Sequence, residues 1–159
     1  MIQIVKDADT RPWFFLQTAH TTYGMRVMET GHLEHLYYGE RITVDSQDPA
    51  SCAPLVIQRA FAPGNTCTYD REHPQISMED VCLEVGTLGK GDIREPFLEV
   101  RFADGSVTSD FTFDSYKIIT LKEREQCLQD SGLPHSYSEV ETDSAECLQI
   151  VLQDVTNHL

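Results

Sequence analysis

The sequence runs WFFLQTAH from Trp13 to His20 and TYGMRVME from Thr22 to Glu29. Both stretches are rich in aromatic and β-branched residues, which favour extended structure. The second stretch also places Tyr23, Met25 and Val27 at alternate positions, the period of a strand with one buried face. These residues therefore predict two consecutive β-strands.

The residues that follow continue the same pattern. Thr30–Gly31 predicts a turn, after which HLEHLYYG (His32–Gly39) returns as a strand and RITV (Arg41–Val44) continues it. The expected arrangement is a set of neighbouring strands joined by short connections.

A second group of strands is expected further along the chain. In PFLEVRF (Pro96–Phe102) the apolar residues alternate with charged ones, and Asp104–Gly105 is a hairpin signal. We expect Val107–Leu121 to complete that hairpin. A last pair, Tyr137–Glu141 and Glu146–Gln153, flanks a polar tip.

These segments amount to about nine strands, and no long segment of helical period competes with them. The predicted fold class is therefore all-β, an antiparallel sandwich. Gln153–His158 has turn composition directly after a strong strand. Because natural sheets cover or pair their edges, we expect the domain to continue beyond Leu159.

The segment from Asp45 to Asp80 is expected to be a long irregular loop, because it is rich in proline and polar residues. Loops of this length are usually functional or disordered. This one carries aromatic and polar residues of the kind that line sugar or protein contacts: Phe61, Tyr69, Asp70, Arg71 and His73.

The net charge argues against two classes of partner. The 159 residues include 12 Lys and Arg and 26 Asp and Glu, which gives a net charge of −14. A chain this acidic is repelled by phosphate backbones and anionic lipid, so no nucleic acid and no membrane is expected as a partner.

The cysteines favour a reducing compartment. Five cysteines are widely spaced, and none forms a CxxC pair, so neither a disulfide framework nor a zinc site is indicated. The N-terminus has no signal-peptide pattern. We therefore expect a cytoplasmic protein.

No catalytic group stands out. Serines lack a nucleophile motif, and acid pairs such as Asp110 and Asp114 are uninformative in so acidic a chain. In a strand, His32 and His35 would lie on opposite faces, so they are not expected to share a metal. Gly86–Asp92 lacks the order of a phosphate loop and is interpreted as a turn-rich connection.

A series of short motifs nevertheless follows one another in a fixed order over nearly the whole chain. They are Trp13–Thr18, Tyr23–Met25, Gly31–Gly39, Arg59–Thr66, Tyr69–Pro74, Ser77–Asp80, Gly89–Pro96, Ala103–Ser106, Thr108–Phe111, Gly132–Pro134 and Glu146–Ile150. In order and spacing they resemble the N-terminal domain of family 36 glycoside hydrolases, the bacterial α-galactosidases that are similar to plant raffinose synthases.

The resemblance implies a multi-domain enzyme. Its parts would be an N-terminal antiparallel β-supersandwich (galactose-mutarotase-like), a central (β/α)8 barrel and a small C-terminal β-domain. Residues 1–159 would be part of the first of these, truncated at its C-terminal side. The two catalytic carboxylates of the retaining mechanism would lie in the barrel, so this chain would hold no catalytic residue and be inactive alone. No metal or organic cofactor is expected, because two carboxylates suffice for this reaction.

The resemblance also implies partners and binding residues. Family members commonly form tetramers in which a loop, here Arg59–Asp80, reaches the active-site mouth of a neighbouring protomer. Phe61 would stack on the α-galactoside, Asp70 would accept sugar hydroxyls, and Arg71 would donate to them or order Asp70. Gln58 is a weaker candidate, because some relatives carry an acid at that place.

A second hypothesis remains open beside this one. The sandwich would then bind carbohydrate or protein as a stand-alone module, as lectin-like sandwiches do. It predicts a reading frame that stops near Leu159 and sugar binding by the lone domain.

Overall fold

A larger sheet of four antiparallel strands forms the centre of the computed structural model, which describes residues 1–57, 68–92, 95–120, 123–124 and 146–156. The strands lie in the order β1-β2-β3-β4. Their bounds are β1 (Ile2–Lys6), β2 (Pro12–Gln17), β3 (Thr21–Val27) and β4 (Leu33–Glu40). Sequence order and spatial order agree, so this sheet is a simple meander.

Strand β2 explains why the sequence signal is strongest at Trp13–Leu16. Phe14 and Phe15 point to opposite faces of the sheet, yet both side chains are 0% exposed. A strand between two neighbours that is covered on both faces needs apolar residues at successive positions. The aromatic run therefore marks the centre of the domain.

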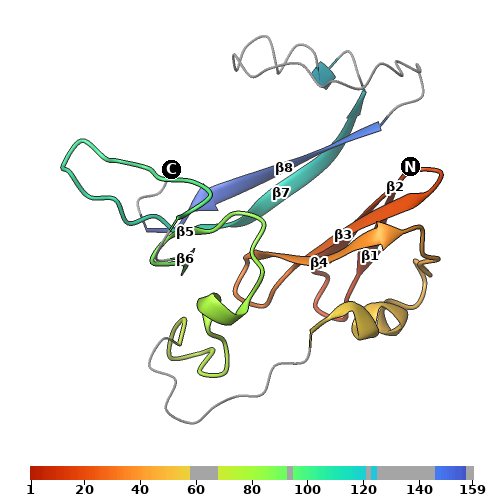
Figure 1. Cartoon of the computed structure of the whole chain (residues 1–159), viewed down its shortest axis with the longest axis horizontal. Coiled ribbons are helices and arrows are strands. Elements are labelled where there is room, and N and C mark those ends of the chain that lie inside the picture. The colour runs from red at the N-terminus through yellow and green to blue at the C-terminus, as the bar shows by residue number, and fades with distance from the viewer. Residues whose placement is uncertain (58–67, 93–94, 121–122, 125–145, 157–159) are drawn as a thin grey trace.

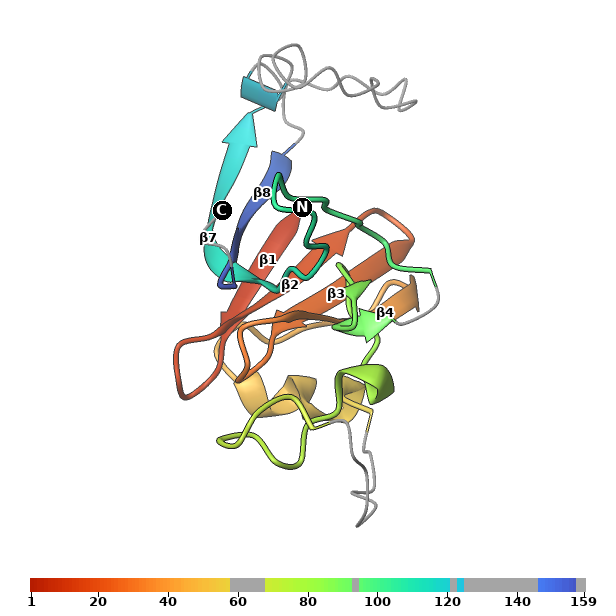
Figure 2. The same cartoon turned by 90° about the vertical axis from the view of Figure 1, so that its left-hand side faces the viewer.

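One face of the larger sheet is covered by a second layer. Strands β7 (Phe111–Thr120) and β8 (Glu146–Asp154) form an antiparallel pair, and Figure 2 shows it beside the larger sheet. Side chains of the pair, Phe113, Tyr116, Leu148, Ile150 and Leu152, pack around Phe14, Val27 and Leu33. The result is the sandwich core.

The other face is covered by a short helix of the 3₁₀ type, η1 (Pro49–Leu55). Cys52 from η1 is 1% exposed and packs with Val5, Trp13 and Phe15. The Asp48 carboxylate begins this helix by accepting a hydrogen bond of 3.1 Å from the Ala50 N–H. In Figure 1, η1 lies on the opposite side of the larger sheet from the β7–β8 pair.

Residues after the long loop return to the larger sheet. A second short 3₁₀ helix, η2 (Met78–Asp80), precedes them. Leu83 bridges Glu34 on the outer edge of β4, where the His35 N–H donates to the Cys82 carbonyl at 2.7 Å. Two-residue strands β5 (Thr87–Leu88) and β6 (Gly91–Asp92) follow. Gly86–Asp92 therefore holds two short strands around the predicted turn, in which Gly89 has a φ of +78°.

Two expected strands are absent from the structure. Arg41–Val44 does not form a strand; side chains hold it instead, because Gln17 Nε2 donates to the Ile42 carbonyl at 2.9 Å and Thr22 Oγ1 accepts from the Ile42 N–H at 3.1 Å. Pro96–Phe102 forms only an isolated bridge, from Leu98 to Thr87.

The pairing of β7 was also predicted wrongly. The turn at Asp104–Gly105 exists, with Gly105 at a φ of +87° and the Phe102 N–H bonded to the Ser106 carbonyl. Strand β7 nevertheless pairs with β8 and not with Pro96–Phe102. Tyr137–Glu141, the other expected strand of the last pair, lies outside the described residues.

The predicted all-β class is confirmed. The described residues contain eight strands, of which the six long ones form the two layers. Within the same residues, no helix has the length and apolar character needed to cross a membrane.

Gly31 provides a first test of this packing. Its φ is +84°, and a Cβ at this position would meet the Thr112 Cβ at 3.0 Å. We expect Gly31→Ala to lower the free energy of unfolding by about 2 kcal/mol, because the cost of a left-handed backbone at alanine and the cost of crowding against β7 add up. Urea denaturation measures it. Gly105→Ala is the matched control, since it has a φ of +87° but no atom within 4 Å of the new Cβ. An equal loss in both variants would contradict the role of Thr112.

Candidate functional site

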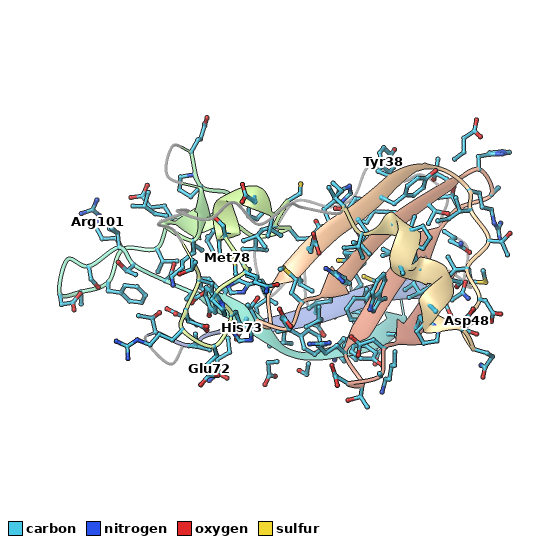
Figure 3. All side chains as sticks on the ribbon, turned by 90° about the horizontal axis from the view of Figure 1, so that it is seen from below. Tyr38, Asp48, Glu72, His73, Met78 and Arg101 are labelled. Carbon is cyan, nitrogen blue, oxygen red and sulfur yellow. The ribbon has the colours of Figure 1, made fainter. Side chains whose placement is uncertain are left out.

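The described end of the long loop, Thr68–Asp80, folds back on itself. Thr68 bridges Ser77, and the Tyr69 N–H donates to the Ile76 carbonyl at 2.8 Å. The residues between them, Asp70–Gln75, form the tip. This arrangement presents the tip on the surface, and Figure 3 shows Glu72 and His73 there, well separated from Asp48 at the start of η1.

Asp70 organises the tip. Its Oδ1 accepts hydrogen bonds from the Glu72 N–H at 2.8 Å and the His73 N–H at 2.7 Å, and the His73 Nδ1 lies 2.9 Å away. Desolvation raises the pKa of Asp70, but the hydrogen bonds from His73 and Glu72 outweigh it and hold that pKa below its usual value. The same contact raises the pKa of His73.

Tyr69 joins this loop to the sandwich. Its hydroxyl donates to Asp110 Oδ2 at 3.0 Å, and its ring meets the His32 ring edge to face at 5.0 Å. The Lys90 ammonium lies 4.8 Å from the centre of the same ring. Burial and the neighbouring Asp110 carboxylate raise the pKa of Tyr69 to about 12, so the phenol keeps its proton as a donor.

Asp110 is the centre of this buried network. Its side chain is 5% exposed; Oδ1 lies 2.7 Å from His32 Nε2, and Oδ2 lies 3.4 Å from Lys90 Nζ. Burial raises the pKa of Asp110, but the hydrogen bond from His32 and the Lys90 charge outweigh it, so the pKa lies below its usual value. Asp110 is therefore ionised. It joins the loop, through Tyr69, to His32 just before β4 and to the start of β7.

The network anchors the loop and leaves its two described candidate binding residues accessible. Asp70 and Arg71 are both exposed. The Arg71 guanidinium makes no ion pair with any other described residue. An exposed carboxylate and an exposed guanidinium on consecutive residues of a loop that is held by buried contacts are suited to bind a polar ligand or partner.

The structure describes two of the four predicted binding residues. Asp70 and Arg71 are consecutive, exposed residues of the tip, whereas Gln58 and Phe61 lie outside the described residues. The ordering of Asp70 comes from His73 and the backbone. A carboxylate accepts up to about four hydrogen bonds, so Asp70 keeps capacity for a sugar hydroxyl, and its role stays a prediction.

The sequence analysis missed the residues that position the loop. Asp110 was set aside as one acid among many, and Lys90 was not singled out. The available signal was His32, because a histidine at the entrance of an apolar strand needs a polar partner once it is buried. Of the metal-ligating side chains within the described ranges, no three or more gather into a possible metal site.

Comparison with known proteins shows which family has this fold. The family model described as the glycosyl hydrolase family 36 N-terminal domain matches residues 31–159. The bifunctional alpha-galactosidase/sucrose kinase AgaSK of Mediterraneibacter gnavus is 34% identical over 142 residues, which are 89% of this chain and 14% of that protein. Alpha-galactosidase AgaA of Geobacillus stearothermophilus is 32% identical over 89% of this chain and 18% of its own length.

Solved structures agree. The alpha-galactosidase of Lactobacillus brevis superposes with a TM-score of 0.70 at 29% identity, over 95% of this chain and 18% of that one. The galactosidase domain of AgaSK superposes with a TM-score of 0.69, over 97% of this chain and 20% of that one. This chain thus spans a fifth or less of the proteins it resembles.

The two-layered β-fold with its anchored loop is thus of the class found within bacterial glycosidases. The chain belongs to the glycosyl hydrolase family 36 N-terminal domain family.

Proposed function

We propose that residues 1–159 are part of the non-catalytic N-terminal domain of an α-galactosidase, which hydrolyses terminal α-galactosides such as melibiose and raffinose. The observation that carries the proposal is the match of residues 31–159 to the N-terminal domain family. The relatives named above are alpha-galactosidases, which supports the substrate class.

Within that enzyme the domain serves oligomerisation and completes the active site of a neighbouring protomer. The loop Arg59–Asp80 makes the contact. The exposed pair Asp70 and Arg71, on a loop fixed by the Tyr69–Asp110 hydrogen bond of 3.0 Å, supports this role. Phe61 and Gln58 belong to the same proposed surface.

The remaining parts of the proposal concern the whole protein. A (β/α)8 barrel would supply both catalytic carboxylates, and a small β-domain would follow it. The enzyme would act in the cytoplasm, which is supported by the free thiols of Cys52, Cys82 and Cys147.

Hydrolysis of a chromogenic α-galactoside tests the proposal. The 159-residue chain and the protein from the uninterrupted reading frame are assayed side by side. We expect activity only in the longer protein, because the chemistry lies in the barrel. Turnover by the short chain, or a reading frame that ends at Leu159, would overturn the proposal and favour a stand-alone binding module.

Arg71 tests the role of the loop in the longer protein. We expect Arg71→Ala to raise KM for raffinose about tenfold with little change in kcat, because loss of a charge-assisted hydrogen bond to bound sugar costs about 1.5 kcal/mol. Arg101→Ala is the matched control, since Arg101 is 70% exposed on another loop. Equal kinetics in both variants would remove Arg71 from the substrate site.

A further inference from the structure

A chain of direct contacts joins a buried carboxylate to an exposed one at the tip of the loop. It begins at Asp110, whose side chain is 5% exposed, and ends at Asp70 on the surface. The residues between them are Tyr69 and His73, both half-buried. Neither of these two is among the predicted binding residues.

Tyr69 is held both at its hydroxyl and at its backbone. The hydroxyl donates to Asp110 Oδ2 at 3.0 Å, and the N–H donates to the Ile76 carbonyl at 2.8 Å. The Lys90 ammonium lies 4.8 Å from the centre of the ring. A tyrosine side chain has few rotatable bonds, so contacts at both of its ends fix the ring between them.

His73 connects this fixed ring to Asp70. The centres of the His73 and Tyr69 rings lie 6.3 Å apart, with an angle of 49° between their planes. His73 Nδ1 lies 2.9 Å from Asp70 Oδ1 and 3.0 Å from Asp70 Oδ2. Because aromatic rings attract one another at separations of about 4.5–7 Å, the Tyr69 ring restricts where His73 lies, and His73 in turn restricts Asp70.

The same contacts leave one oxygen of Asp70 able to bind a ligand. Oδ1 accepts hydrogen bonds from the Glu72 and His73 N–H groups and also faces the His73 ring. Among the hydrogen bonds of the described residues, Oδ2 meets only His73 Nδ1. An ionised carboxylate oxygen accepts about two hydrogen bonds, so Oδ2 can take one more.

We propose that Tyr69 and His73 are positioning residues, which hold the Asp70 carboxylate where it accepts a hydroxyl of the sugar. Both act through Asp70, and neither needs to touch the sugar itself. The inference rests on the proposed function, because it needs the loop to reach the active site of a neighbouring protomer.

Kinetics of raffinose hydrolysis by the longer protein test this role. We expect Tyr69→Phe and His73→Ala each to raise KM about three- to fivefold with kcat unchanged, because apparent affinity falls with the fraction of loops that hold Asp70 in place. His73→Asn should restore most of the affinity lost in His73→Ala, because the asparagine amide also offers an N–H to Asp70. Adding Tyr69→Phe to Asp70→Ala should raise KM by less than about twofold, because no carboxylate is left to position.

A similar group of side chains elsewhere in the chain provides matched controls. The Tyr23 hydroxyl donates to Glu84 Oε2 at 2.5 Å, and His35 Nδ1 lies 3.0 Å from Glu84 Oε1. The Tyr23 ring lies 6.0 Å from that of Tyr38, which Figure 3 shows well separated from His73. We expect Tyr23→Phe and His35→Ala to leave KM and kcat unchanged.

A second measurement needs no enzyme activity. NMR titration of the 159-residue chain gives the pKa of His73. The hydrogen bond with Asp70 raises this pKa above its ordinary value of 6.5, and the nearby carboxylates of Glu29 and Glu72 contribute less. We expect Tyr69→Phe to shift the pKa of His73 back toward its ordinary value, because the contact with Asp70 loosens, and Tyr23→Phe to leave it unchanged.

An unchanged pKa of His73 in Tyr69→Phe would overturn the proposal, and so would an unchanged KM in the active enzyme or a failure of His73→Asn to restore affinity. An equal rise in KM in Tyr23→Phe would also overturn it, because lost stability alone would then explain the effect. Absence of raffinose hydrolysis by the longer protein would overturn the proposed function and this proposal together, whereas the other results concern this proposal alone.

Discussion

Asp110→Ala should lower the free energy of unfolding by about 3–5 kcal/mol, because it leaves the buried His32 and the Tyr69 hydroxyl without their acceptor. This loss is a large share of the 5–15 kcal/mol that typically stabilises a domain. Urea denaturation, followed by the fluorescence of the only tryptophan, Trp13, measures it. Trp13 is buried in the core and so reports on global unfolding.

Asp114→Ala is the matched control for Asp110. Asp114 also belongs to β7, but it is exposed and accepts a hydrogen bond from the neighbouring Ser115 hydroxyl. We expect the stability of this variant to change by less than about 0.5 kcal/mol. Similar losses in the two variants would show that net charge, and not the buried network, determines the effect.

Acid should destabilise the fold by protonating the same Asp110 carboxylate. The pKa of Asp110 is lowered in the folded state from 3.8. The stability that this carboxylate contributes is therefore fully present above its unfolded pKa and is lost as the pH falls through the folded pKa. Asp110→Asn should flatten this part of the acid unfolding curve, whereas an unchanged curve would place the acid-sensitive group elsewhere.

Phe14→Ala should lower the free energy of unfolding by a comparable amount, about 3–5 kcal/mol, because the ring is 0% exposed where the two layers meet. The ring contacts Tyr116 edge to face at 5.1 Å and lies 6.2 Å from Phe113. Its removal leaves a cavity between β2 and the β7–β8 pair. Thermal unfolding followed by circular dichroism measures the loss.

Phe97→Ala is the control for Phe14, since Phe97 is 78% exposed. We expect the melting temperature of this variant to match that of the unchanged chain. A small loss in Phe14→Ala, similar to that of the control, would mean that the two layers do not form one cooperative core.

The larger sheet could be predicted from the sequence because its signals are local. Aromatic residues at Trp13–Leu16 and alternation at Tyr23–Val27 mark strands that pair with their sequence neighbours. The partner of β7 could not be predicted in this way. It lies at Glu146–Asp154, whereas the turn at Asp104–Gly105 offered a nearer and equally plausible partner.

Side-chain hydrogen bonds explain why the strand at Arg41–Val44 was predicted wrongly and why the buried network was missed. Arg41–Val44 has strand composition, but Gln17 and Thr22 bond to the backbone at Ile42 and replace a strand neighbour. Similarly, the loop and its exposed residues Asp70 and Arg71 were predicted from composition, whereas the network of His32, Tyr69 and Asp110 joins distant parts of the chain. No local pattern reveals such a network before the fold is known.

The bridge between Glu34 and Leu83 has a consequence for how this family can diversify. Because the segment between Glu40 and Leu83 leaves strand β4 and returns to the same strand, its two ends are fixed by the sheet and not by its own contents. Doubling the length of such a closed segment costs only about 0.6 kcal/mol of chain entropy. Within this segment Cys52 packs into the core and Tyr69 bonds to Asp110. The chain between these two fixed points can therefore be lengthened or shortened while the register of the strands beneath stays the same.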